Sequence, residues 1–228
     1  MASATTAERA SCAEARGAAN LSRMPRTPRD KLPGIHHVWV NATGNWAYYI
    51  DDIDRLEWIR LLVYVADRNG WRIPAFCQMT THVHAVVAVE DESLPFGMAH
   101  LNREYSKHFN ARHARVGHFV RKRYGSRRVT DSGDLLGAYA YVVLNPVREG
   151  MCERAEDWRW SSYATSIGLT KDFSFIDAGA VLAELGGSVR ALRELVSARA
   201  AMPVRSGRVR YQVPDVLRKD SAPPRAAA

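Results

Sequence analysis

Apolar and polar residues follow several different spacings along the chain, and the changes between spacings predict four strands and five helices. Three of the strands are β-prone runs that end at turn residues, and the fourth is a short run after a basic loop. The predicted strands cover residues 35–40, 72–79, 82–89 and 128–130. The predicted helices begin after Asp51 or Asp52, at Pro95 and near Asp134, and two more cover residues 178–185 and 189–200.

Apolar residues at helical spacing predict which side of the first two helices is buried. In the first helix, which we expect to end at Asn69–Gly70, these positions are Ile53, Leu56, Ile59, Leu62, Val63 and Ala66. In the second helix they are Met98, Leu101, Tyr105 and Phe109. An aromatic cluster over residues 158–163 is expected to pack against the same body.

The elements follow one another as strand, helix, strand, strand, helix, strand, helix. This order predicts an α+β fold, a ferredoxin-like or RRM-like antiparallel sheet with helices on one face, plus C-terminal helices. Residues 1–33 and the basic residues 203–228 have no sustained apolar period, which predicts disordered tails. A fold does not by itself give a function, so the chemistry has to come from particular side chains.

The composition narrows the class of protein. Hydrophobic residues make up 46% of the 228 residues, which is enough for a packed core. The longest apolar run, near residues 85–89, is far shorter than the roughly 18 residues that cross a bilayer. The first 30 residues lack the apolar segment of a signal peptide, so we expect a cytoplasmic protein without membrane contact. Three widely spaced cysteines exclude a disulfide scaffold and a four-cysteine zinc site.

Positive charge is concentrated in one segment. The formal net charge is +8, and residues 103–128 contain nine basic residues and one acid, Glu104, so this segment holds the whole excess. Clustered cations mixed with histidines and aromatic residues indicate a surface for a polyanion, usually nucleic acid. The alternative is a solvated helix face with a basic tail. The basic residues are Arg103, Lys107, Arg112, Arg115, Arg121, Lys122, Arg123, Arg127 and Arg128.

Two histidines lie two residues apart in the third predicted strand. Because strand side chains alternate between faces, His82 and His84 are expected on one face, a few ångströms apart. Two imidazoles placed in this way can bind a divalent cation. A His-x-His match is short, so ordinary hydrogen-bonded histidines are the alternative.

A tyrosine and an asparagine share one side of the third predicted helix. Tyr141 and Asn145 are four residues apart, and Gly137 leaves room one turn earlier. The helix is otherwise apolar and is expected to end near Asn145–Pro146. A plainer interpretation is a core tyrosine with a partner for its hydroxyl, and an asparagine that caps the helix.

The ordered pair of motifs resembles a known family. His82-Val83-His84 followed by Tyr141-x-x-x-Asn145-Pro146-Val147-Arg148 is similar to the single-tyrosine HUH transposases, and within them to the REP-associated tyrosine transposases. The resemblance covers about residues 35–165 and departs from the family at Thr80–Thr81, where relatives often have Pro and Asn or Asp. It implies a transposase domain over residues 34–168, and the two helices predicted after that domain indicate a helical extension over 169–202.

The resemblance implies a transposase that nicks and rejoins single-stranded DNA, an activity used in DNA transposition and recombination. Tyr141 would be the nucleophile and would form a 5′-phosphotyrosine. His82, His84 and Asn145 would hold one divalent metal ion. Two imidazoles alone favour zinc or another transition ion, so the choice of Mg²⁺ or Mn²⁺ comes from the resemblance.

The resemblance also implies the partners. Single-stranded or hairpin DNA would follow the basic segment, and the protein would act as a monomer or a homodimer. Tyr105, Phe109, Phe119 and Tyr124 are candidates for stacking on unpaired bases, although helical spacing favours the core for the first two.

Two other functions compete with this one. A non-catalytic nucleic-acid-binding protein on the same fold, such as a domesticated transposase, would need neither the histidine pair nor the tyrosine. A zinc hydrolase or deaminase would need a Cys-x-x-C or His-x-Glu set, which the sequence lacks.

Overall fold

The computed structural model describes residues 32–44, 46–120 and 123–202, so most of the predicted leader and the whole predicted tail lie outside the described residues. The first part contains β1 (Gly34–Asn41), α2 (Asp52–Asn69), β2 (Arg72–Gln78), β3 (His82–Val89), α3 (Leu94–Arg112), β4 (Gly125–Arg128) and α4 (Ser132–Val143). The second part contains α5 (Asn145–Arg148), a 3₁₀ turn (Ala155–Asp157), α6 (Tyr163–Ser166), α7 (Gly179–Ala183) and α8 (Val189–Ala200). In the described part of the chain, no helix is long and apolar enough to cross a membrane.

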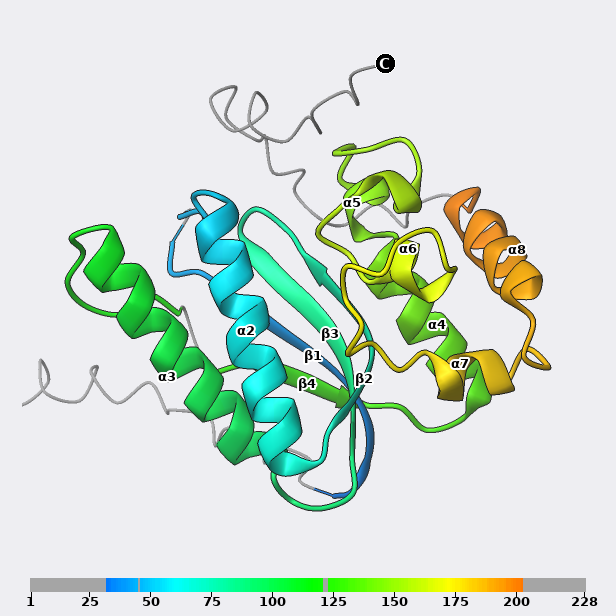
Figure 1. The fold of residues 1–228 in the computed structure, drawn as a ribbon, viewed down its shortest axis with the longest axis horizontal. Coiled ribbons are helices and arrows are strands. Elements are labelled where there is room, and N and C mark those ends of the chain that lie inside the picture. The colour runs from blue at the N-terminus through cyan, green and yellow to red at the C-terminus, as the bar shows by residue number, and fades with distance from the viewer. Residues whose placement is uncertain (1–31, 45, 121–122, 203–228) are drawn as a thin grey trace, which may run out of the picture.

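The four strands form one antiparallel sheet in the order β2-β3-β1-β4. Helix α2 connects β1 to β2, and helix α3 connects β3 to β4, so each connection crosses over one intervening strand. This is the ferredoxin-like arrangement, and the α+β fold class predicted from the sequence is confirmed. Figure 1 shows α2 and α3 lying side by side along the sheet.

Helices cover both faces of the sheet, α2 and α3 on one and α4 on the other. Val83 and Ala85 of β3 face α2 and α3, where they line a small apolar cavity with Trp58. On the opposite face, the ring of His84 contacts Tyr141 of α4. The physical reason lies in the sequence of β3, in which seven of eight residues are buried, because an almost continuous apolar strand needs cover on both sides.

Side chains that cap the helices fix where they begin and end. The Asp51 carboxylate accepts hydrogen bonds from the backbone N–H groups of Ile53 and Asp54 at the start of α2. Gly70 ends the helix in a left-handed conformation, with φ of 63°. Asp131 caps α4 in the same way as Asp51, so all three boundaries agree with the sequence.

The prediction was wrong about the buried side of α2 and about the position of the last strand. Ile53 and Leu56 are 56% and 55% exposed, because α2 buries Trp58, Leu61 and Val65 against the sheet and α3 instead.

The last strand lies at 125–128 rather than 128–130, because its pairing with β1 decides its position, and its own residues, Gly-Ser-Arg-Arg, have little strand preference. The indole of Trp39 packs on Gly125, where there is no room for a side chain.

Candidate active site

His82 and His84 lie on one face of β3, as their spacing predicted. They pair with Asn41 and Trp39 of β1, and their ring centroids are 5.0 Å apart. His84 is buried and His82 is half-buried. The pair therefore lies on a central strand of the sheet, close to the end of β1.

A third histidine, which the sequence analysis missed, completes the cluster. His37 of β1 lies diagonally across from His84, with its Nε2 3.0 Å from Nδ1 of His84 and the two rings stacked at 5.1 Å. Both side chains are at least nine-tenths buried. In the sequence, His37 lies two residues before Trp39, so the two side chains are expected on the same face of β1. Trp39 pairs with His84, but only the β1–β3 register shows that His37 and His84 lie together.

Tyr141 of α4 packs against this cluster. Its ring centroid lies 5.4 Å from those of His37 and His84. The guanidinium of Arg148 lies over the tyrosine ring, 5.2 Å from its centroid. This contact is a cation–π interaction with the face of the tyrosine ring.

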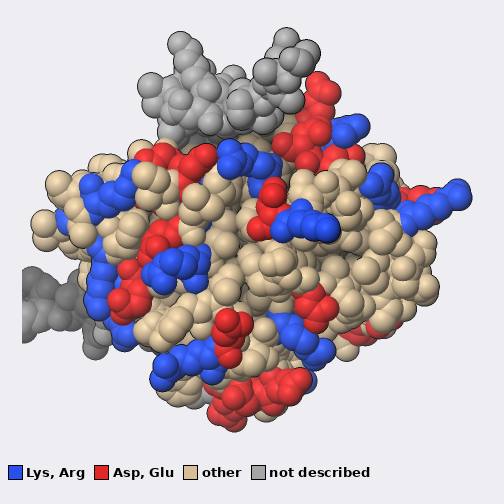
Figure 2. Space-filling model, in the orientation of Figure 1, with Lys and Arg blue, Asp and Glu red and all other residues tan. Residues whose placement is uncertain are grey.

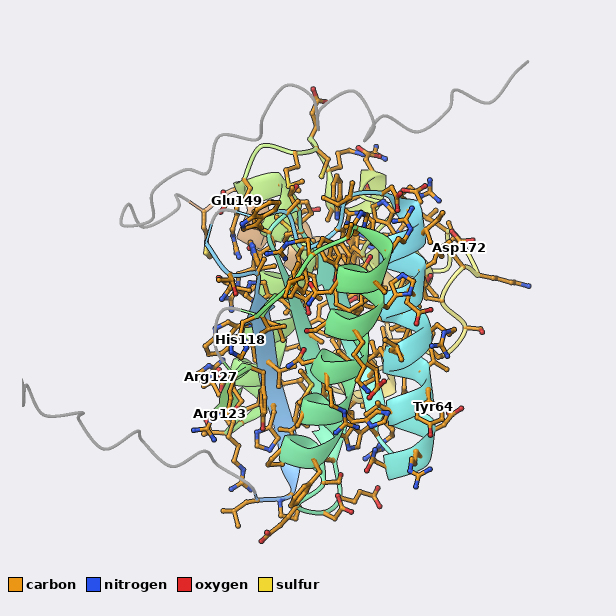
Figure 3. All side chains as sticks on the ribbon, turned by 90° about the vertical axis from the view of Figure 1, so that its left-hand side faces the viewer. Tyr64, His118, Arg123, Arg127, Glu149 and Asp172 are labelled. Carbon is orange, nitrogen blue, oxygen red and sulfur yellow. The ribbon has the colours of Figure 1, made fainter. Side chains whose placement is uncertain are left out.

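Burial separates Tyr141 from the other described tyrosines. Six of the eight described tyrosines are buried in the core. In three of them, Tyr49, Tyr105 and Tyr139, burial raises the pKa of the phenol above its ordinary value. Those phenols stay neutral and out of reach of a substrate. Tyr64 is exposed on α2, on the outer side of the molecule (Figure 3). In the described part of the chain, Tyr141 is therefore the accessible tyrosine that lies beside the histidines.

Asn145 is buried directly after α4 and bonds back to the helix. Its Nδ2 donates to the carbonyl of Tyr141 at 3.3 Å, and Arg148 Nη1 donates to the same carbonyl at 3.4 Å. This is the capping role that the sequence left open as an alternative. No contact between Asn145 and an imidazole is recorded among the described residues, so its predicted role as a metal ligand stays a prediction.

The hydrogen bonds of the two strand histidines suit a metal site. His82 Nδ1 is 3.1 Å from the hydroxyl of Thr81, and His84 Nδ1 is bonded to His37. A ligating histidine typically engages one ring nitrogen in such a bond and binds metal through the other, so coordination would fall to Nε2 in both rings. Within the described ranges no group of three or more His, Cys, Asp or Glu side chains could hold a metal ion, so water or phosphate oxygens would have to complete the ligand set.

An ion pair attaches the beginning of α4 to the edge of the sheet. Arg127 Nη1 of β4 lies 2.6 Å from Asp134 Oδ2, and the backbone N–H of Thr130 donates to the same oxygen at 3.1 Å. Because Tyr141 lies two turns further along α4, this pair helps to set the position of the tyrosine.

We expect Asp134→Asn to lower the free energy of unfolding by about 1 kcal/mol, the upper range for a partly exposed ion pair. The pKa of Asp134 lies below its usual value because Arg127 donates a hydrogen bond to it. Such a carboxyl stabilises the fold fully above its unfolded pKa, about 3.9, and the contribution is lost as pH falls through the lower folded pKa. Urea midpoints of parent and variant should differ by a constant amount above about pH 4 and converge below it. A difference that persists at lower pH would contradict the pairing.

The structure divides the predicted DNA-binding residues by their partners. Four are ion-paired: Arg103 and Lys107 with Glu104, Arg112 with Asp51 and Asp54, and Arg127 with Asp134. Arg128 lies beside Gly34, whereas Arg115 and Arg123 have no carboxylate partner among the described residues. Arg121 and Lys122 lie outside the described residues.

Figure 2 shows Lys and Arg interspersed with Asp and Glu on the face that it displays. Figure 3 shows Arg123 and Arg127 on the same side of the molecule as His118, opposite Tyr64. Among the described members of the basic segment, several cations are therefore neutralised by carboxylates that a charge count along the sequence cannot pair with them.

Comparison with solved structures shows the fold. A REP-associated tyrosine transposase bound to a REP hairpin is similar with a TM-score of 0.57 and 15% identity, over 68% of this chain and 98% of that one. The resemblance noted in the sequence is thereby confirmed at the level of the fold. The tRNA(His) guanylyltransferase of Saccharomyces cerevisiae has a TM-score of 0.39 and 8% identity, over 84% of this chain and 88% of that one, and carries no argument. No family model and no curated protein matches the chain.

Proposed function

We propose that the chain is a metal-assisted transposase that nicks and rejoins single-stranded hairpin DNA through Tyr141. One observation carries the proposal: Tyr141, 57 residues after His84, lies with its ring 5.4 Å from that imidazole. A core tyrosine on an apolar helix needs no histidine cluster beside it. The shared fold of a transposase that binds a hairpin supports the same conclusion.

In the proposed reaction, the phenol oxygen of Tyr141 attacks the scissile phosphorus and loses its proton to water. The bond from phosphorus to the 3′ oxygen breaks, that oxygen takes up a proton, and a 5′-phosphotyrosine remains. Arg148 lies over the face of the tyrosine ring, and the carbonyl of Tyr141 is fixed by Asn145. A bound Mg²⁺ or Mn²⁺ would polarise the phosphate, held by His82 and His84 with Asn145 as the third candidate. A second strand's 3′-hydroxyl can reverse the attack and rejoin DNA.

The covalent intermediate provides the test. Labelled single-stranded hairpin DNA, incubated with the protein and Mg²⁺ or Mn²⁺, should give an adduct on a denaturing gel, and peptide mapping should place the DNA on Tyr141. Chelation of the metal should prevent its formation. Tight DNA binding without any adduct, on a series of palindromic substrates, would instead indicate the non-catalytic nucleic-acid-binding protein.

His37 is expected to position His84 for metal binding. Its removal by His37→Ala should weaken Mn²⁺ binding about 10- to 100-fold, the usual effect of losing a residue that orients a ligand. Calorimetric titration with Mn²⁺ measures this, and His37→Gln should restore part of the affinity because an amide can occupy the same hydrogen bond. His36→Ala is the matched control, since His36 is also buried in β1 but its Nε2 lies 3.0 Å from the carbonyl of Leu32. Equal losses in both variants would contradict the positioning role.

A further inference from the structure

We propose that Trp46 and Arg115 form a stacking site for one unpaired nucleobase of single-stranded DNA. The choice of ligand rests on the proposed function, and the site lies outside the Tyr141 cluster. All six tryptophans lie within the described residues, and among them only Trp46 is exposed, at 53%. Phe96 and Tyr64 are exposed as well, and the neighbours of Trp46 distinguish it from them.

Arg115 supports the inner side of this tryptophan. Its guanidinium carbon lies 4.4 Å from the centroid of the Trp46 ring, and 5.6 and 5.9 Å from those of Phe119 and Phe109. Nη1 of Arg115 is buried with no hydrogen-bond acceptor, and the residue has no ion pair with a carboxylate among the described residues. No carboxylate of the described residues therefore neutralises this charge, unlike that of Arg112 three residues earlier.

Backbone hydrogen bonds hold both halves of the pair in place. On the tryptophan side, Thr43 N donates to Phe119 O at 2.7 Å, and Tyr48 N donates to Thr80 O at 2.7 Å. The loop with Arg115 is fixed to the end of α3, where Arg115 N donates to Asn110 O at 2.8 Å and Asn110 Nδ2 donates to Gly117 O at 2.9 Å. A preorganised aromatic surface binds a base with a smaller loss of conformational entropy.

The pair lies at the end of the sheet that carries the histidines. The residues on either side of the Trp46 loop bond to the turn before His82: Ala42 N donates to Thr81 O at 3.0 Å, and Tyr48 N donates to Thr80 O at 2.7 Å. A DNA strand bound at the end of the sheet that carries His82 would therefore pass close to Trp46.

Burial excludes the aromatic residues that the sequence suggested for stacking. Tyr105, Phe109, Phe119 and Tyr124 are at most 3% exposed, so none of them can present a ring face to a base. Trp46 lies outside the basic segment in sequence, and Arg115 of that segment lies against its ring. An exposed indole backed by an uncompensated cation suits a nucleotide, whose base stacks on the ring and whose phosphate meets the charge.

The test compares two DNA ligands by fluorescence anisotropy with the full chain. One is a hairpin with an unpaired flank, and the other is a blunt, fully paired duplex with the same stem sequence. Trp46→Ala should weaken binding of the flanked hairpin about tenfold and leave the duplex unchanged, whereas Trp46→Phe should keep most of the affinity. Phe96→Ala is the matched control, because Phe96 is 73% exposed near the start of α3, and about 24 Å of helix separate it from Arg112, where α3 ends.

The outcomes separate this inference from the proposed function. If the parent forms the Tyr141 adduct and Trp46→Ala binds the flanked hairpin as tightly as Phe96→Ala does, the stacking site is wrong and the transposase proposal stands. An equal loss on hairpin and duplex also contradicts stacking, because paired bases present no free face. If the parent binds neither DNA, the stacking site and the proposed function fail together.

Discussion

Tyr141→Phe should abolish the covalent protein–DNA adduct, with a loss of cleavage of at least about a thousandfold, while DNA binding stays within about twofold of the parent. The substitution removes only the attacking oxygen. The ring stays, and with it the contacts to His37, His84 and Arg148 that hold α4 against the sheet. A large effect on chemistry with little effect on folding is the pattern expected of a nucleophile.

Tyr64→Phe is the matched control for this experiment. It also removes one phenol oxygen from a tyrosine outside the core, but Tyr64 lies on α2, where Arg68 Nη1 donates to its hydroxyl at 3.4 Å. Cleavage rates on a labelled hairpin and the yield of adduct on a denaturing gel measure both variants. If Tyr141→Phe keeps the adduct, or loses it together with its thermal unfolding transition, Tyr141 is not the nucleophile that the geometry favours.

Local spacing explains the parts of the candidate site that the sequence predicted. The shared face of His82 and His84 follows from the two-residue period of a strand, and the proximity of Tyr141 to Asn145 follows from one helical turn. These relations need only the type of element, and the caps at Asp51 and Asp131 fix where the elements begin. The fold class followed from the order of the elements in the same way.

Long-range pairing explains what the sequence could not give. His37 reaches His84 across 47 residues, and only the β1–β3 register decides that contact. Arg112 was expected to bind DNA, but it is ion-paired with Asp54, 58 residues earlier in the chain. A charge count along the chain cannot separate such a cation from Arg115, which has no carboxylate partner among the described residues.

The residues of β3 also explain why helices cover both faces of the sheet. The strand β3 reads His-Val-His-Ala-Val-Val-Ala-Val, and the sequence analysis used its alternation to place the histidines. The apolar residues Val86 and Ala88 share the histidine face, so that face has to be covered as well. Helix α4 covers this face, and the same packing places Tyr141 beside the histidines.

His84→Ala should remove measurable Mn²⁺ binding and reduce cleavage at least about a hundredfold, a larger effect than that of His37→Ala. The two strand imidazoles are the nitrogen ligands of the proposed site, and the loss of one leaves a single imidazole that cannot fix the ion near the phosphate. DNA binding should persist, because cations such as Arg115 and Arg123 lie outside the cluster. Calorimetry with Mn²⁺, anisotropy and the adduct assay measure the three properties separately.

A second variant separates metal binding from packing. His84 is 6% exposed and its Nδ1 is bonded to His37, so His84→Ala also opens a cavity and leaves a buried imidazole without that bond. His82 is half-buried, and its recorded hydrogen bond is to its neighbour Thr81, so His82→Ala should cause the same loss of Mn²⁺ binding with a smaller change in thermal stability. If His82→Ala binds Mn²⁺ and forms adduct like the parent, the imidazoles do not form a metal site. The histidine cluster would then serve only to pack α4 against the sheet, and cleavage by the parent should be insensitive to chelation of the metal.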